Sequence, residues 1–198
     1  MGTTLIIILA IVVLLVVYLI NIFNTLVAYK NRYVNGFANI DIQLKRRYDL
    51  IPNLIEVAKK AMVHERETLE AVISARNEAA SLLKSAAANP GDATSMSKLS
   101  NAEGVLSGAM SRFSMVMEAY PDLKTNQNMM QLTEELTTTE NTVAFARQAF
   151  NDAVMVYNIY RQSFPQILFA ATFGHAVDAK LLEFEDKVAI QAVPKVSF

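Results

Sequence analysis

The chain opens on a long, unbroken run of apolar residues. The run covers residues 5–20, and Ile22 and Phe23 extend it past Asn21. As an α-helix, the nineteen residues 5–23 span roughly 29 Å. That length matches the hydrocarbon core of a bilayer, which is about 30 Å thick. The pattern predicts a transmembrane helix over residues 5–23, within an anchor formed by residues 1–23.

A cleaved signal peptide is the competing interpretation of such a run. Signal peptides begin with basic residues and end in a small-residue cleavage site. Residues 1–4 carry no basic side chain and residues 18–24 contain no Ala-x-Ala sequence, which favours an uncleaved anchor. Basic residues follow the run at Lys30, Arg32 and 45–47, whereas none precedes it. By the positive-inside rule we expect the N-terminus outside and the following domain in the cytoplasm.

Behind the anchor, apolar residues recur every three or four positions, which is typical of an amphipathic helix. The first such stripe contains Phe37, Ile40, Leu44, Tyr48, Ile51, Ile55, Ala58 and Met62. It predicts a helix over residues 24–87. Pro52 lies inside this stripe and removes one backbone donor. We favour a kink there because the stripe keeps its phase, while a break at Pro52 would give a hairpin and a four-helix bundle.

Two further helices are predicted, over about 94–119 and about 126–163. An Asn-Pro-Gly-Asp stretch at 89–92 precedes the second helix, and Pro121 marks its end. Glu103 is the only charged residue in the apolar stripe of the second helix. The third helix keeps an alternating spacing of four and three over more than four heptads, as in a coiled coil.

These elements predict an all-α fold, with a transmembrane helix followed by a long antiparallel bundle of three long helices. The bundle domain covers residues 24–186, and residues 187–198 form a loosely held tail. Three passes joined by short loops place the apolar cluster 164–173 at the membrane-distal end, folded back over the bundle. Residues 181–186 are expected to form a short helix.

Composition narrows the possible functions. The chain has 198 residues, of which 53% are hydrophobic, and it contains no cysteine. The missing cysteines exclude a disulfide scaffold, a thiolate metal site and a cysteine nucleophile. The net charge is −1, which gives no indication of nucleic-acid binding.

No catalytic motif is complete. Residues 64–68 begin like the zinc motif HExxH, but Thr68 replaces its second histidine. Two polar groups remain: the basic run 45–47, and the carboxylates Glu134, Glu135 and Glu140 with Arg147. The carboxylates could bind a metal or transfer protons. We favour ion pairing of these carboxylates with Arg46 and Arg47, so no catalytic, metal or cofactor site is predicted.

Four segments together resemble the LemA family. They are residues 29–35 with 40–54, residues 119–126, residues 132–158, and Phe164-Pro165 with the apolar run that ends at Phe173-Gly174. The resemblance extends from the membrane span to about Glu185. It implies a bacterial inner-membrane protein with one N-terminal span and a cytoplasmic helical domain. It implies no established activity and no catalytic residues.

The sequence therefore favours a non-enzymatic membrane-anchored scaffold of the bacterial cell envelope that contacts the bilayer through residues 5–23. We expect a homo-oligomer, because three helices bury little of each helix surface. The alternative is an anionic-lipid-binding module that uses the basic residues near the span. Those residues are Lys30, Arg32, Lys45, Arg46 and Arg47. An enzyme or metal site at the carboxylates is a distant third hypothesis.

Overall fold

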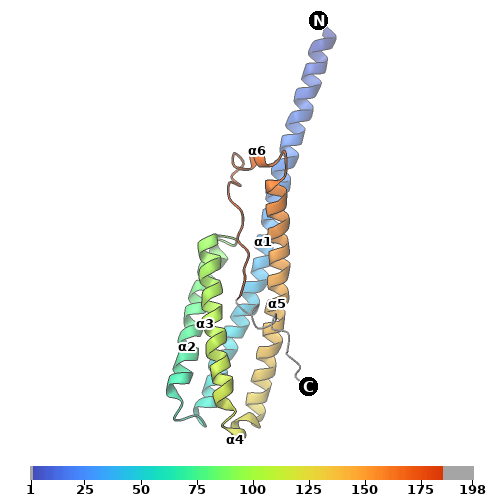
Figure 1. The fold of residues 1–198 in the computed structure, drawn as a ribbon. Helices are drawn as coiled ribbons and strands as arrows, with labels where there is room; N and C mark the ends of the chain where they lie inside the picture. The colour runs from blue at the N-terminus through green and yellow to red at the C-terminus, as the bar shows by residue number, and fades with distance from the viewer. Residues whose placement is uncertain (1, 185–198) are drawn as a thin grey trace, which may run out of the picture.

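A computed structural model describes residues 2–184, and every regular element in that range is a helix, which confirms the all-α fold (Figure 1). The elements are α1 Gly2–Lys59, α2 Arg66–Ala88, α3 Ala93–Met117, α4 Pro121–Lys124, α5 Gln127–Gln162 and α6 Ile167–Ala170. Helix α5 runs along α1, α3 runs along α2, and α1 joins the two pairs by packing against α2. The predicted tail, residues 187–198, lies outside the described residues.

The N-terminal part of α1 projects alone from the bundle (Figure 1). Its most apolar window has a mean hydropathy of 3.3 and is almost entirely exposed, so this helix is apolar enough to span a membrane. Burial begins near the end of the span, where Ile22 and Leu26 are fully covered by the bundle. The same helix therefore forms both the span and the first helix of the bundle, with no linker between them.

The expectation of one helix over residues 24–87 is wrong. The chain reverses direction between Lys59 and Arg66, and α2 runs back along α1. Met62, inside this turn, is fully buried and covers the end of the core. The next residue of the apolar stripe, Leu69, comes seven positions later, which keeps the helical phase, so the stripe alone does not mark the turn. Neither glycine nor proline marks this turn, and the packing of Met62 explains it better than any local signal.

Pro52 does not break the first helix, because α1 continues through it to Lys59. A proline has no N–H, so the carbonyl of Tyr48, four residues earlier, loses its usual helical partner. Nε of Arg76 in α2 donates to that carbonyl at 2.9 Å. The proline therefore creates an acceptor that a side chain of the neighbouring helix satisfies.

The apolar cluster 164–173 lies at the membrane-proximal end, and its predicted distal position is wrong. The ring of Phe173 packs edge-on against Phe23, with centroids 5.5 Å apart. Helix α6 accordingly lies where the N-terminal part of α1 leaves the bundle (Figure 1). The extra reversal after α1 is the reason, because the bundle makes four long passes and α5 returns toward the span.

Helices α1 and α5 are held in register by edge-to-face aromatic pairs. Tyr29 meets Tyr160 with ring centroids 5.3 Å apart, and Phe37 meets Phe150 at 5.5 Å. Such pairs contribute about 0.5–1.5 kcal/mol each beyond their buried area. Helix α5 begins where predicted, because the side chain of Asn126 accepts hydrogen bonds from the first-turn amides.

We expect Arg76→Ala to lower the free energy of unfolding by about 1–3 kcal/mol, because it leaves the Tyr48 carbonyl without a donor. In a Pro52→Ala background the same change costs less, because the introduced alanine supplies the missing helical N–H. Chemical unfolding of the detergent-solubilised chain, followed by circular dichroism, measures both. Arg66→Ala is the control, since its ion pair with Glu70 is exposed. Equal costs for Arg76→Ala in the two backgrounds contradict this role of Arg76.

Candidate functional site

A buried polar centre joins α1 to α3. Nη2 of Arg47 lies 2.8 Å from Oε2 of Glu103, whose side chain is only 2% exposed. The hydroxyl of Tyr48 donates to the other carboxylate oxygen, Oε1. Burial, together with the adjacent Glu103 charge, raises the pKa of Tyr48 far above its usual value. The phenol therefore stays protonated and remains a donor at every physiological pH.

Glu103 lies within the apolar stripe of α3, between the fully buried Leu99 and Leu106. A carboxylate in such surroundings needs a compensating charge or hydrogen bonds. Both come from α1, so the observed register of α3 relative to α1 is one in which the Glu103 charge is compensated. The contacts of Glu103 neutralise its charge and fix the position of α3 relative to α1.

A small cavity of about 220 Å³ lies beside this centre. Arg47, Glu140 and Arg147 all line it, so the structure brings together three of the residues singled out in the sequence. The ring of Phe184 closes one side, and the guanidinium carbon of Arg147 lies 4.3 Å from its centroid. Because positive and negative side chains meet here in similar numbers, the cavity does not select strongly for either sign of ligand.

The remaining candidates lie elsewhere. Arg46, Glu134 and Glu135 are exposed and do not line the cavity. Arg47 pairs with Glu103 of α3, which sequence reasoning noted as a charged residue in an apolar stripe but did not assign as a partner. In residues 2–184, no group of three or more His, Cys, Asp or Glu side chains could hold a metal ion.

An extended segment, residues 175–184, lies along α5 and carries Phe184 to the cavity. Residues 181–184 are not helical, so the short helix expected over 181–186 is wrong for its described part. Two asparagines of α5, seven residues apart, hold the segment. Asn158 donates to the carbonyl of Ala179 and accepts from its amide, both at 2.9 Å. Asn151 makes the same pair of bonds to Leu182, at 3.0 and 2.9 Å.

The loop between α2 and α3 supports the segment from the other side. The amide of Lys180 donates to the carbonyl of Gly91 at 2.7 Å. Gly91 has a φ of +86°, and a Cβ added there would lie 3.0 Å from Cβ of Ala179. Only glycine combines this backbone conformation with such a close approach. Burial, with a smaller contribution from Lys30, lowers the pKa of His175, which lies where the segment begins.

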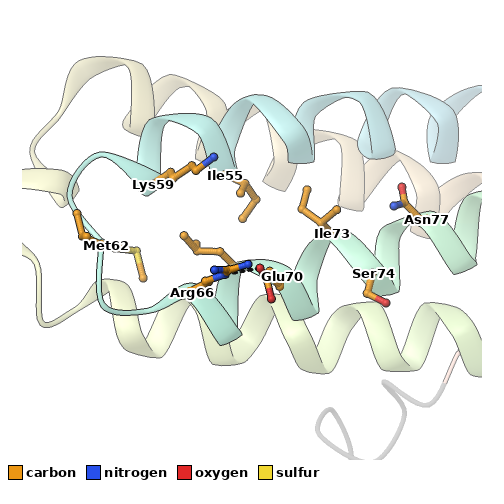
Figure 2. A pocket seen from close by; sticks show the side chains of 10 residues that line it. Ile55, Lys59, Met62, Arg66, Glu70, Ile73, Ser74 and Asn77 are labelled. Carbon is orange, nitrogen blue, oxygen red and sulfur yellow. Dashed lines mark hydrogen bonds and ion pairs between the residues drawn. The ribbon is translucent and has the colours of Figure 1, made fainter.

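An open apolar cleft of about 780 Å³ lies at the end of the bundle farthest from the span (Figure 2). Ile55 and Lys59 of α1, Met62 and Val63 of the turn, and Leu69 and Ile73 of α2 line it. Figure 2 shows Arg66 beside Glu70, and Nε of Arg66 donates to Glu70 at 2.6 Å. Sequence reasoning missed this cleft, because it forms around the unpredicted turn after α1.

The family model that describes the LemA family matches residues 36–198, which is most of the chain. The chain belongs to the LemA family. No curated protein matches it as a relative. The polar centre, the extended segment and the distal cleft all lie inside the LemA match, whereas the predicted span lies before it. These three features therefore belong to the part of the chain that the LemA family model covers.

We expect Glu103→Ala to lower the free energy of unfolding of this LemA protein by about 3–5 kcal/mol, because it leaves Arg47 buried without its carboxylate. The double variant Arg47→Met with Glu103→Leu should lose much less, since it removes both charges. Glu70→Ala, at an exposed ion pair, is the matched control. Thermal unfolding in detergent measures all three. A double variant that loses as much stability as Glu103→Ala would contradict the pairing.

We expect Asn158→Ala to expose the amide of Ala179, because it removes both hydrogen bonds between that residue and α5. A net loss of about 1.4 kcal/mol corresponds to a tenfold faster amide exchange in the segment. Hydrogen–deuterium exchange with mass spectrometry measures this in the full chain. Asn141→Ala, at an exposed position of α5, should leave the segment unchanged. Unchanged protection in Asn158→Ala would show that other contacts hold the segment.

Proposed function

We propose that this chain is a non-enzymatic scaffold of the bacterial cytoplasmic membrane that docks a protein partner in the distal cleft. The observation that carries the proposal is an open apolar cleft of about 780 Å³ far from the span. From Phe23 to Lys59, α1 rises roughly 54 Å. A partner in the cleft is held at a set distance from the membrane.

The cleft has the chemistry of a site for an amphipathic helix. Its floor is aliphatic, and Val63 at its edge is 68% exposed. Lys59 supplies positive charge at its rim, whereas Arg66 is paired with Glu70. A helix that places apolar side chains on the floor and acidic side chains near Lys59 complements both features. Apolar clefts rimmed by polar residues are typical of interaction sites.

Self-association belongs to the same proposal. Either a second copy of this chain or a different protein fits the chemistry of the cleft. The mass of the complex distinguishes the two. The N-out orientation, with the cleft in the cytoplasm, is also part of the proposal. It is supported by Lys30 and Arg32, which are exposed just after the span.

The alternative role in binding anionic lipids is supported at only two of its five basic residues. Lys30 and Arg32 lie roughly 11 and 14 Å along α1 from Phe23, close to the headgroups. Lys45 and Arg46 lie about 33 Å from Phe23, well beyond the Debye length of about 8 Å at physiological salt. Arg47 is buried against Glu103. We therefore prefer the protein-docking role.

Crosslinking from the cleft tests the proposal directly, because the chain has no natural cysteine. We expect a thiol-specific photocrosslinker attached to Val63→Cys to give a defined product in native membranes. Its mass distinguishes a second copy from another protein. Adding Ser74→Arg, which places a long side chain in the cleft, should abolish the product. Ser114→Cys, exposed on α3, is the matched control.

Three results would count against cleft docking. The first is a crosslinked product of equal yield from Ser114→Cys. The second is a product from Val63→Cys that persists unchanged in the presence of Ser74→Arg. Failure to form any product at Val63 would also count against the proposal, since its side chain lies at the edge of the cleft.

A further inference from the structure

Residues 164–173, which we call the hook, follow α5 and lie at the end of the bundle nearest the span. The hook includes α6 (Figure 1). Phe173 contacts Phe23, the last residue of the apolar run, with ring centroids 5.5 Å apart. Leu19, one turn inside that run, already packs against the bundle core. The end of the bundle that carries the hook thus meets the span at the depth where the hydrocarbon core ends.

The hook exposes large apolar side chains that the bundle does not cover. Phe164 is 80% exposed and Leu168 is 62% exposed, and Ile167 is also exposed. Burying apolar side chains of this size is favourable, because it removes their surface from water. These three neighbours in sequence are therefore unfavourably placed in water and well suited to an apolar environment.

The hook carries no charge that would oppose entry into such an environment. Residues 162–174 contain no Asp, Glu, Lys or Arg. The nearest charged residue on the α5 side, Arg161, is paired with Asp178. An uncharged apolar segment, next to exposed basic residues such as Lys30, has the pattern of a membrane-interface segment.

The hook is also held in place from within. Ala170 is fully buried, and its carbonyl accepts from the amide of His175 at 2.8 Å. Nδ1 of His175 lies 2.9 Å from the hydroxyl of Tyr157 in α5. Phe169 stacks on Phe173, with centroids 6.2 Å apart. Because these contacts fix the backbone of the hook, the exposed side chains keep a set position beside the span.

We propose that the hook is a second membrane contact, in which Phe164, Ile167 and Leu168 insert into the interfacial region of the leaflet from which α1 emerges. The bilayer is the occupant because the surface is continuous with the span through the contact between Phe173 and Phe23. Contact at two points fixes the tilt and rotation of the bundle relative to the membrane, which a single helix does not do.

Depth-dependent fluorescence quenching tests this in the full chain, because the protein contains no tryptophan. Phe164→Trp places one reporter in the hook. Phe145→Trp is the matched control, since Phe145 is 74% exposed on α5, well away from the span. Both variants are reconstituted in phosphatidylcholine vesicles with and without lipid brominated on its acyl chains. Aqueous iodide is the second quencher.

We expect Phe164→Trp to show blue-shifted emission, strong quenching by brominated lipid and little quenching by iodide. Phe145→Trp should show the reverse. Quenching of both variants by iodide alone would overturn the proposal, because the hook would then lie in water. Protection of Phe164→Trp from both quenchers would also overturn it, because a protein surface would then cover the hook. Leu168→Trp gives an independent reading if Phe164→Trp does not fold.

Discussion

Tyr48 of α1 forms hydrogen bonds to both α2 and α3. Its hydroxyl donates to the buried carboxylate of Glu103 in α3, and its carbonyl accepts from Arg76 in α2. The carbonyl is available only because Pro52 lacks an N–H. Two polar groups of one residue thus fix the α2–α3 pair against α1 at the same level. The aliphatic core around them gives the larger stabilisation, but it is less directional and would tolerate other registers.

The sequence predicted those elements whose ends carry local chemistry. The span is fixed by its length and hydropathy, and α3 and α5 begin at side chains that cap them, Asp92 and Asn126. The turn after α1 has no such signal. Its residues have no strong bias against helix, and the reversal depends on packing Met62 at the end of the core. Because this turn was missed, the cluster 164–173 was placed at the wrong end of the bundle. Each reversal of the chain moves the following segment to the opposite end.

The site was only partly predictable for the same reason. A charged residue in an apolar stripe marked Glu103 as unusual, but its partner depends on which helix faces it. Arg47 was expected to pair with a carboxylate of the third predicted helix and pairs with Glu103 instead. In the sequence, Asn151 and Asn158 do not differ from other polar residues of a helix. Their spacing of two helical turns indicates a binding surface only once the extended segment lies beside them. The distal cleft depends wholly on the missed turn.

The continuity of α1 links the two proposed contact surfaces mechanically. Because α1 runs from its apolar segment to the cleft without a linker, the cleft keeps a fixed position relative to that segment. Pro52 is the one proline inside it, and prolines are where helices usually bend. Here the residue is braced, because Arg76 satisfies the carbonyl that the proline leaves free. With α5 packed along the same helix, α1 has no free hinge between the cleft and the hook.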